Sequence, residues 1–325
     1  MSYERQMLEN YKMPIQKEVE KALLQTLFDN HGVIKDFGFG EKIVAEIANA
    51  FHLSKEQQTV YLETVYKKEN RIKKSYLWHR LLFRAADSLA KQKLITRPAQ
   101  TMVITNKKEW MLTEDGYNKV LERLGLPLSQ KEFLPVRSYE VEKMVGNFYR
   151  QKRPVNYDPF ETKKTTRINR DAKLRNRAFR QAVKEAYNFK CAVCGLIIYS
   201  PTNTSQWEVE AAHIVPHRKN GKDDILNGLA LCRLHHWAFD VGWFTLDDNF
   251  MILPSPKIRG LPSEYGKFGS YNFINALSKG NTRISLPIQQ DIYPHPNAIK
   301  WHRENIFILN SMEETWQTKM KLSIP

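Results

Sequence analysis

The sequence has little cysteine and no long apolar run, and each shortage excludes a class of protein. Only three cysteines occur among 325 residues, all between positions 191 and 232, so a disulfide scaffold is excluded. No stretch approaches the roughly 18 to 20 consecutive apolar residues that span a bilayer, and no membrane partner is expected. The first residues, MSYERQMLENYKMP, lack the apolar core of a signal peptide, which favours a cytoplasmic protein.

Acidic residues are also scarce relative to basic ones. The 50 Lys and Arg against 35 Asp and Glu leave a formal net charge of +15 at pH 7. Such a surplus favours a polyanionic partner, nucleic acid first of all, although a solvated basic surface without a partner is the alternative. The composition, 42% hydrophobic and 26% charged, is that of a globular protein, and the length predicts two domains.

Residues 1–127 carry the pattern of a small, mostly helical domain. Apolar residues recur at helical spacing, and the run after the third helix is β-prone on both sides of Asn106. The predicted elements are helices over 14–30, 41–51 and 73–95, a hairpin over 96–113, and a last helix over 113–125. Three helices, a hairpin and a closing helix are the order of a winged-helix domain.

From residue 128 the composition changes. Lys and Arg greatly outnumber Asp and Glu between Arg150 and Lys184. We therefore interpret residues 128–169 as a basic linker, followed by a helix that leads into the C-terminal domain, residues 170–325. The whole chain is expected to be an α+β protein with two domains.

Four metal-ligating side chains are paired at short spacing. Cys191 and Cys194 form a C-x2-C turn followed by Gly195, and Cys232 and His235 repeat the two-residue gap. Positions i and i+3 of a helix share a face, so both pairs can reach one tetrahedral Zn²⁺. A closed Cys3His set leaves no position for a substrate, which predicts a structural zinc. Buried cysteines without a metal are the alternative.

A second set of polar residues lies between and after these ligands. His213 ends the apolar-rich segment WEVEAAHIVP, Asn227 lies in the following loop, and His236 is on the helix after Cys232. With the phrases NGLALC and HHWAFD, this order resembles the HNH nuclease family over roughly residues 170–248. The resemblance implies a ββα-metal fold, in which a two-stranded hairpin packs with a helix.

The resemblance also implies the roles of these residues. His213 would act as general base, Asn227 would orient it, and His236 would bind one catalytic divalent ion. Neighbours on a helix point about 100° apart, so His236 is expected to pair with Asp240 rather than share the zinc with His235. An imidazole and a carboxylate make a mixed site that suits Mg²⁺ or Mn²⁺.

One position departs from the family pattern. Many HNH proteins carry Asp or His just before the general base as a further metal ligand, and this sequence has Ala212 there. Glu210 lies two positions earlier on the same strand face and is a candidate to replace that ligand. The alternative is that Glu210 is an ordinary exposed strand residue.

The first 127 residues resemble the winged-helix domain at the front of Mrr-type restriction proteins. The phrases LWHRLLFRAADSLAKQKLI and WMLTEDGYNKVL carry this resemblance. A winged helix usually lays its third helix in the major groove and its wing along the backbone. The resemblance implies DNA contacts there, with a solvated charged face as the alternative; the residues are Lys73, Lys74, Arg80, Arg84, Lys107 and Lys108. Trp78 and Trp110 would either stack on an extruded base or anchor the core.

A winged helix joined to an HNH nuclease resembles the modification-dependent restriction endonucleases of phage defence. The resemblance implies hydrolysis of phosphodiester bonds in modified double-stranded DNA, with methyl- or hydroxymethylcytosine favoured over methyladenine as the sensed base. The alternatives are an HNH enzyme of homing or phage-packaging type and a non-catalytic winged-helix regulator. One HNH site cuts one strand, so a double-strand break would need a homodimer or two successive nicks.

Overall fold

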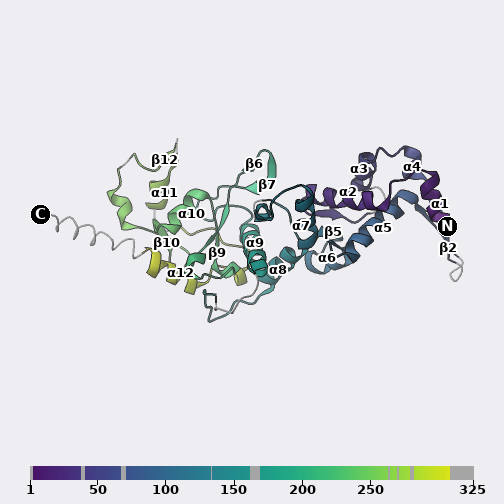
Figure 1. The fold of residues 1–325 in the computed structure, drawn as a ribbon. Coiled ribbons are helices and arrows are strands. Elements are labelled where there is room, and N and C mark those ends of the chain that lie inside the picture. The colour runs from purple at the N-terminus through teal and green to yellow at the C-terminus, as the bar shows by residue number, and fades with distance from the viewer. Residues whose placement is uncertain are drawn as a thin grey trace. The chain divides into compact units, whose positions relative to one another are not determined.

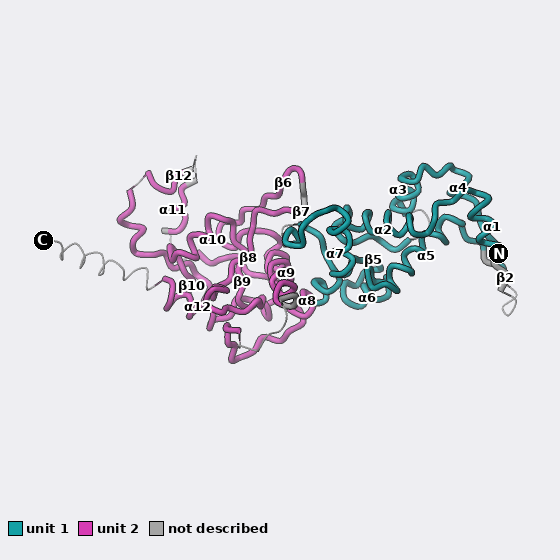
Figure 2. The backbone as a smooth tube through the Cα atoms, in the orientation of Figure 1, with its two compact units in different colours: residues 1–143 teal, residues 144–325 magenta. Residues whose placement is uncertain are grey.

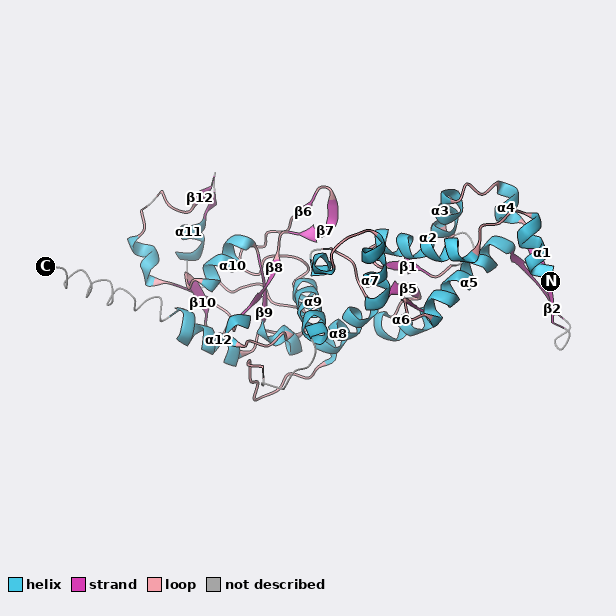
Figure 3. Cartoon of the chain, viewed as in Figure 1, coloured by secondary structure: helices cyan, strands magenta, loops and turns pink. Residues whose placement is uncertain are grey.

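The computed structural model describes most of the chain: residues 3–37, 41–66, 71–132, 134–161, 169–262, 264–268, 271–278 and 282–307. It divides into two compact units, residues 1–143 and 144–325, which are coloured separately in Figure 2. Both units mix helices and strands, as Figure 3 shows, so the α+β class is confirmed. Among the described residues, no helix is long and apolar enough to cross a membrane.

Unit 1 contains the elements from α1 to η1, and its helices α1 to α7 are labelled in Figure 1. Their bounds are α1 Tyr3–Asn10, α2 Gln16–Asp29, β1 Val33–Lys35, α3 Lys42–Ala50, α4 Lys55–Thr59, β2 Tyr61–Tyr66, β3 Arg71–Tyr76, α5 Leu77–Lys91, β4 Ile95–Thr96, α6 Pro98–Thr105, β5 Glu109–Leu112, α7 Glu114–Arg123 and the 3-10 helix η1 Leu128–Glu132. Helix α8, Tyr139–Arg150, begins in this unit and ends in the next.

The core of unit 1 forms where α2 packs on α5. Leu23 and Leu27 of α2 are fully buried, as are Leu77 and Leu82 of α5, so the apolar spacing in both segments predicted the core face. Three antiparallel strands cover this core in the order β1-β5-β4, with Val33 opposite Met111 in β5. The helices expected near residues 14–30, 41–51 and 113–125 are confirmed.

The hairpin expected over residues 96–113 is wrong in its first arm. Strands β4 and β5 do pair, but helix α6 connects them. Pro98 starts this helix at a position where its missing N–H costs nothing, and the Gln100 side chain accepts a hydrogen bond from the Arg97 backbone N–H. Asn106 ends it in the left-handed conformation, with φ 57°. The second arm of the expected wing is therefore strand β5, whereas helix α6 occupies the place of its first arm.

The segment before Leu77 also differs from the expectation. Lys73 and Lys74 were assigned to the third helix, whereas strand β3 contains both and pairs with β2 in a hairpin that the sequence did not reveal. Lys74 Nζ lies 2.9 Å from Glu63 across that hairpin. The side chain of Lys73 lies outside the part of the chain that is described.

Unit 2 contains the rest of α8 and the elements up to η6. Their bounds are α9 Asn169–Ala186, β6 Tyr199–Ser200, β7 Asn203–Trp207, β8 Glu210–His213, η2 His217–Lys219, η3 Ile225–Asn227, β9 Gly228–Leu231, α10 Arg233–Asp240, β10 Phe244–Leu246, β11 Ile252–Pro254, η4 Pro256–Gly260, β12 Lys267–Phe268, β13 Tyr271–Asn272, α11 Phe273–Ser278, η5 Gln290–Ile292, α12 Pro296–His302 and the π-helical turn η6 Arg303–Phe307. The strands form antiparallel pairs, of which β8-β9 positions the site.

The stretch interpreted as a basic linker is ordered in its described part. It contains η1, α8 and an extended segment that packs within unit 2, where the Lys222 backbone N–H donates to Pro159 O at 2.9 Å. Arg153 donates to Pro294 O at 2.9 Å. Residues 162–168, in the middle of the basic stretch, lie outside the described part.

Helix α9 packs directly on the β8-β9 pair. The contact is close because Gly228 starts β9 there: a Cβ at that position would lie 2.4 Å from Val183 Cγ2 and 3.0 Å from Phe179. The register of the pair sets His213 opposite Gly228. Helix α9 thereby brings the Phe179 ring against the end of β8, where the candidate site begins.

Candidate functional site

The first cluster joins the turn after α9 to the start of α10. Cys191 and Cys194 lie in a tight turn closed by a hydrogen bond from Gly195 N–H to Cys191 O, and Gly195 takes the left-handed φ of +73° that this turn needs. Cys232 is the N-cap of α10, and His235 lies in the first turn of that helix. The predicted ligand pairs are therefore brought together from two distant segments.

The four ligand atoms are close enough together for one metal ion, although the 3.0 Å between Cys232 Sγ and His235 Nδ1 is shorter than a tetrahedral edge. They all lie within 4.8 Å of one another. A tetrahedron with Zn–S bonds near 2.3 Å and Zn–N bonds near 2.05 Å needs S···S edges of about 3.8 Å and S···N edges of about 3.6 Å. The Cys194–Cys232 sulfur distance is 3.9 Å, and Cys191 Sγ lies 3.7 Å from His235 Nδ1. This Cys3His cluster can bind a metal ion.

The environment of Cys191 favours the form of its thiol that binds a metal. Hydrogen bonds from Cys194 and Cys232 lower the pKa of the Cys191 thiol, which favours the thiolate form that metals bind. Cys191 and Cys232 are buried, while Cys194 is exposed, so the cluster lies at the edge of unit 2 rather than in its centre.

The second cluster lies where α10 packs on β8. His236 Nδ1 is 2.8 Å from Glu210 Oε2, and His236 Nε2 is 3.7 Å from Asp240 Oδ2. The predicted pair of His236 and Asp240 therefore shares one face of α10, as the i,i+4 spacing requires. Glu210 is not an isolated strand residue, because it contacts the opposite nitrogen of the same imidazole.

This arrangement gives Glu210 a definite place. A ligating histidine commonly donates its second ring N–H to a carboxylate, which fixes the ring and its tautomer. Glu210 occupies that position, and Nε2 then faces Asp240. Ala212 is fully buried and offers no ligand. The residues that could hold a divalent ion are therefore His236 and Asp240, with Glu210 orienting the imidazole.

Asp240 is half-exposed among charged groups of both signs, and the pKa of its carboxyl group is raised on balance. Burial raises the pKa of its carboxyl group, and the charges of His236, Arg218 and His213 act in the opposite direction. These three groups come from α10, from the η2 turn and from the end of β8. The predicted general base, His213, and the predicted metal ligands, His236 and Asp240, are therefore close enough to interact electrostatically.

His213 is held by contacts that the sequence did not reveal. Its Nε2 lies 2.8 Å from Asp223 Oδ1, and its ring stacks on Phe179 with centroids 4.0 Å apart. Asn227, expected to orient this histidine, is fully buried and bonded elsewhere: its Oδ1 accepts from Val215 N–H at 2.8 Å. Nothing in the spacing distinguished Asp223, because its contact depends on how the loop before β9 folds back.

The predicted DNA-binding residues of unit 1 have mixed environments. Arg80 and Arg84 both form ion pairs with Glu4 of α1, at 2.8 and 2.9 Å. Trp78 and Trp110 are buried, and their indole N–H groups donate to Val44 O and to the Asp36 carboxylate. Both indoles are therefore core anchors, which is the alternative that the sequence left open, and are not available to stack on a base.

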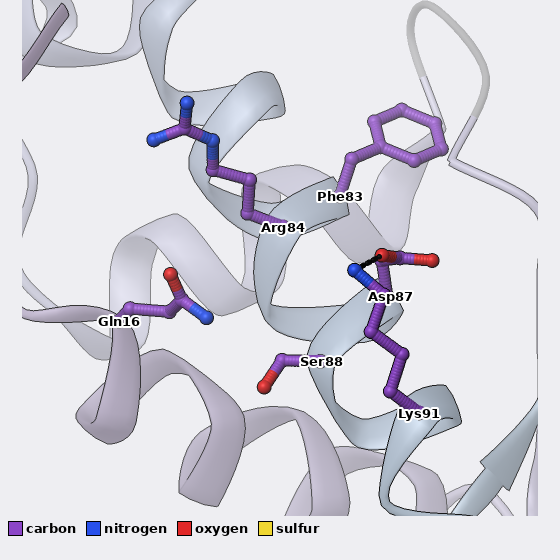
Figure 4. Close-up of a pocket in the computed structure, with 6 residues that line it drawn as sticks. All are labelled: Gln16, Phe83, Arg84, Asp87, Ser88 and Lys91. Carbon is purple, nitrogen blue, oxygen red and sulfur yellow. Dashed lines mark ion pairs between the residues drawn. The ribbon is translucent and has the colours of Figure 1, made fainter.

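Unit 1 also has an open pocket of about 410 Å³ beside α5 (Figure 4). Gln16 of α2 lines it together with Phe83, Arg84, Asp87, Ser88 and Lys91. Hydrogen bonds from Lys91 and Arg97 lower the pKa of Asp87, which therefore stays ionised. Lys107 and Lys108 are exposed in the loop between α6 and β5.

Residues 191–247 match the family model of the HNH endonucleases. The match includes the Cys3His cluster, His213, Asn227, His236 and Asp240. The chain is also similar to a solved structure titled "Modification dependent TagI restriction endonuclease", with 21% sequence identity and a TM-score of 0.28. That similarity covers 39% of this chain and 37% of the other, so it spans little more than a third of either. No curated protein matches this sequence.

Proposed function

We propose that the protein is a metal-dependent DNA endonuclease that hydrolyses phosphodiester bonds. The observation that carries this proposal is the β8-β9-α10 unit, which has His213 at the end of a strand and His236 with Asp240 on the following helix, within the HNH match. HNH nucleases use divalent metals, and a divalent ion bound here would stabilise the charge that develops on the scissile phosphate.

The residues of the site have separate roles in this proposal. His213 accepts a proton from the attacking water, and His236 and Asp240 hold the ion. Glu210 fixes the His236 ring through the 2.8 Å contact with Nδ1. Arg218 is exposed next to this cluster, where its charge can attract a phosphate.

The Cys3His cluster is proposed to hold a structural Zn²⁺. Four protein donors would complete the coordination of Zn²⁺ and leave no position for a substrate. The cluster joins the start of α10 to the turn after α9, so the metal would fix the helix that carries His236. Magnesium or manganese is proposed for the other site because it offers a carboxylate, which suits these hard ions, and no thiolate.

The finer proposal is that unit 1 directs cleavage to modified DNA, with methyl- or hydroxymethylcytosine as the sensed base. Its support is chemical: HNH residues act on phosphates, which carry no sequence information, so discrimination has to come from elsewhere in the chain. The exposed Lys107 and Lys108, and Arg84 beside the α5 pocket, are the groups proposed to contact DNA.

The nuclease proposal is tested by comparing His213→Ala with His217→Ala on plasmid DNA in Mg²⁺ and in Mn²⁺. Loss of a general base costs about 10²–10⁴ in rate and leaves DNA affinity nearly unchanged. His217 is exposed in the next turn and serves as the matched control. Equal cleavage by the two variants would refute the assignment of His213.

The modification proposal needs a separate experiment. Matched oligonucleotides that carry cytosine, 5-methylcytosine, 5-hydroxymethylcytosine or N6-methyladenine are digested by the full chain under one set of conditions. Preferential cutting of the cytosine-modified duplexes is expected. Equal rates on all four substrates would leave a nuclease without modification dependence, as in the homing or phage-packaging alternative.

A further inference from the structure

We propose that Asp223 is the positioning residue of the general base, and that it selects the tautomer of His213 in which Nδ1 accepts the proton. The inference rests on the proposed nuclease function and deepens it. It replaces the expectation that Asn227 orients the base.

Three contacts hold the pair in place. Asp223 Oδ1 lies 2.8 Å from His213 Nε2, and the side chain of Asp223 is only 8% exposed. Asn176 of α9 donates to the same carboxylate oxygen at 3.4 Å. The His213 ring stacks on Phe179 of the same helix, with an interplanar angle of 19°. Helix α9 therefore restrains both the imidazole and its partner.

The side chain of Asn227 forms its hydrogen bonds with the backbone and not with His213. Its side-chain amide donates to Val215 O at 3.1 Å and to Lys222 O at 3.0 Å, and its oxygen accepts from Val215 N–H. Both amide protons are used, and the residue is fully buried. Because one of these bonds anchors Lys222, Asn227 fixes the backbone that leads directly into Asp223.

The tautomer follows from these contacts. A neutral imidazole carries one N–H, and an ionised carboxylate can only accept. His213 must therefore place its proton on Nε2, which leaves the lone pair on Nδ1. Nδ1 makes no hydrogen bond to any residue that the structure describes, and 15% of the side chain remains exposed.

In the hydrolysis step, one proton moves to His213 and one P–O bond replaces another. Nδ1 takes a proton from water, the water oxygen forms a bond to phosphorus, and the bond from phosphorus to the 3′-oxygen breaks. The imidazolium that forms carries an N–H at both nitrogens, and the Nε2–H faces the Asp223 carboxylate. The 3′-oxygen gains a proton from solvent. Asp223 thus stabilises the cation without being protonated itself.

The first test reads the tautomer and needs no substrate. Histidine ¹⁵N shifts of the full-length protein at neutral pH are compared between the wild type, His213→Ala (which assigns the signal) and Asp223→Asn. The expected result is an Nε2–H tautomer for His213 in the wild type and a loss of that preference in Asp223→Asn, whose amide can donate to Nε2. An Nδ1–H tautomer in the wild type would overturn the inference.

The second test is kinetic and has a matched control. Asp223→Asn should lower kcat by about 10²–10⁴ with little change in KM, because a wrong tautomer removes the base and not the binding. Asp223→Glu, which restores a carboxylate, should recover part of the rate. Asp224→Asn is the control, because Asp224 accepts from Leu226 N–H and Gln151 and does not contact His213.

The outcomes separate this inference from the proposed function. If the wild type cuts DNA and Asp223→Asn cuts as fast as Asp224→Asn, Asp223 has no positioning role although the nuclease stands. If the wild type cuts no DNA in Mg²⁺ or Mn²⁺ while His213 holds the Nε2–H tautomer, the nuclease proposal fails and the contact with Asp223 is structural.

Discussion

Two carboxylates lie against opposite nitrogens of the His236 imidazole. Glu210 takes Nδ1 from the strand side, and Asp240 faces Nε2 from one turn along the same helix. A histidine fixed on one nitrogen presents the other as a ligand at no further cost in ring rotation. Because Ala212 offers no ligand, the site lacks the donor that Asp or His would supply at that position, and the orientation of His236 matters more for metal binding.

Removing the charge of Glu210 should therefore weaken metal binding. In Glu210→Gln, we expect the Mn²⁺ concentration for half-maximal cleavage to rise about 10- to 100-fold, because the carboxylate no longer orients His236. Glu208→Gln is the control, since Glu208 bonds the Arg233 backbone and not His236. A metal titration that is the same in both variants would assign Glu210 a packing role only.

The buried histidine His302 makes stability depend on pH. His302 stacks on Phe239 with centroids 3.7 Å apart, and its two nitrogens contact Thr245 Oγ1 and Phe239 O. Burial lowers its pKa to about 4. Between pH 6.5 and 4 the unfolded chain therefore binds the proton that the folded chain refuses, so stability is highest above this window and falls as the pH drops.

The loss should reach about 3 kcal/mol at pH 4, since each pKa unit corresponds to about 1.36 kcal/mol. Urea unfolding of unit 2, followed at pH 7 and at pH 5, should show a smaller pH effect for His302→Asn than for the wild type. His217→Asn, at an exposed histidine of the same unit, is the matched control. An unchanged pH dependence in His302→Asn would contradict the assignment.

Local spacing predicted the helices because their apolar faces become the core. The same rule failed at α6, where Met102 and Val103 looked like strand residues but are 40% and 76% exposed. Their apolar side chains point to solvent, so burial did not decide the conformation. The start at Pro98 and the left-handed end at Asn106 decided it instead.

In the candidate site too, contacts within one segment were predictable from the sequence and contacts between segments were not. Each of these pairs is local (C-x2-C, C-x2-H, and His236 with Asp240), so sequence spacing predicted that the two side chains within a pair lie close together. The contacts of Glu210 with His236 and of Asp223 with His213 depend on strand register and on the loop fold. No periodicity encodes such contacts, because each partner is chosen by tertiary packing.

The contact between α9 and the β8-β9 pair should be sensitive to a single methyl group. Gly228→Ala would place a Cβ 2.4 Å from Val183 Cγ2, and overpacking of this kind costs about 1–3 kcal/mol. Cleavage should fall as well, because Phe179 supports the His213 ring. Gly260→Ala is the control, since nothing lies within 4 Å of its Cβ position. Equal denaturation midpoints would show that α9 yields without cost.

Across the whole chain, the 50 Lys and Arg residues outnumber the 35 Asp and Glu residues by 15. In unit 1, ion pairs offset only part of this positive charge, because single carboxylates pair with two basic side chains. Glu4 pairs with both Arg80 and Arg84, and Asp87 pairs with both Lys91 and Arg97. A carboxylate between two cations offsets one unit of charge, so the charges of these three side chains sum to +1 in each group. The two Asp87 pairs are exposed at the surface, and pairs of this kind are weak enough to rearrange.

These surplus charges should appear in the salt dependence of DNA binding. If the full chain makes about five phosphate contacts, log affinity falls with log salt at a slope near −4.5. In EDTA, which prevents cleavage, Arg84→Gln with Lys91→Gln should reduce the magnitude of the slope by about 2, because each lost contact removes about 0.9. Lys42→Gln, on an exposed residue of α3 paired with Glu46, should leave it unchanged. An unaltered slope in the double variant would remove α5 from the DNA-binding surface, because phosphate contacts cannot be lost without releasing fewer counterions.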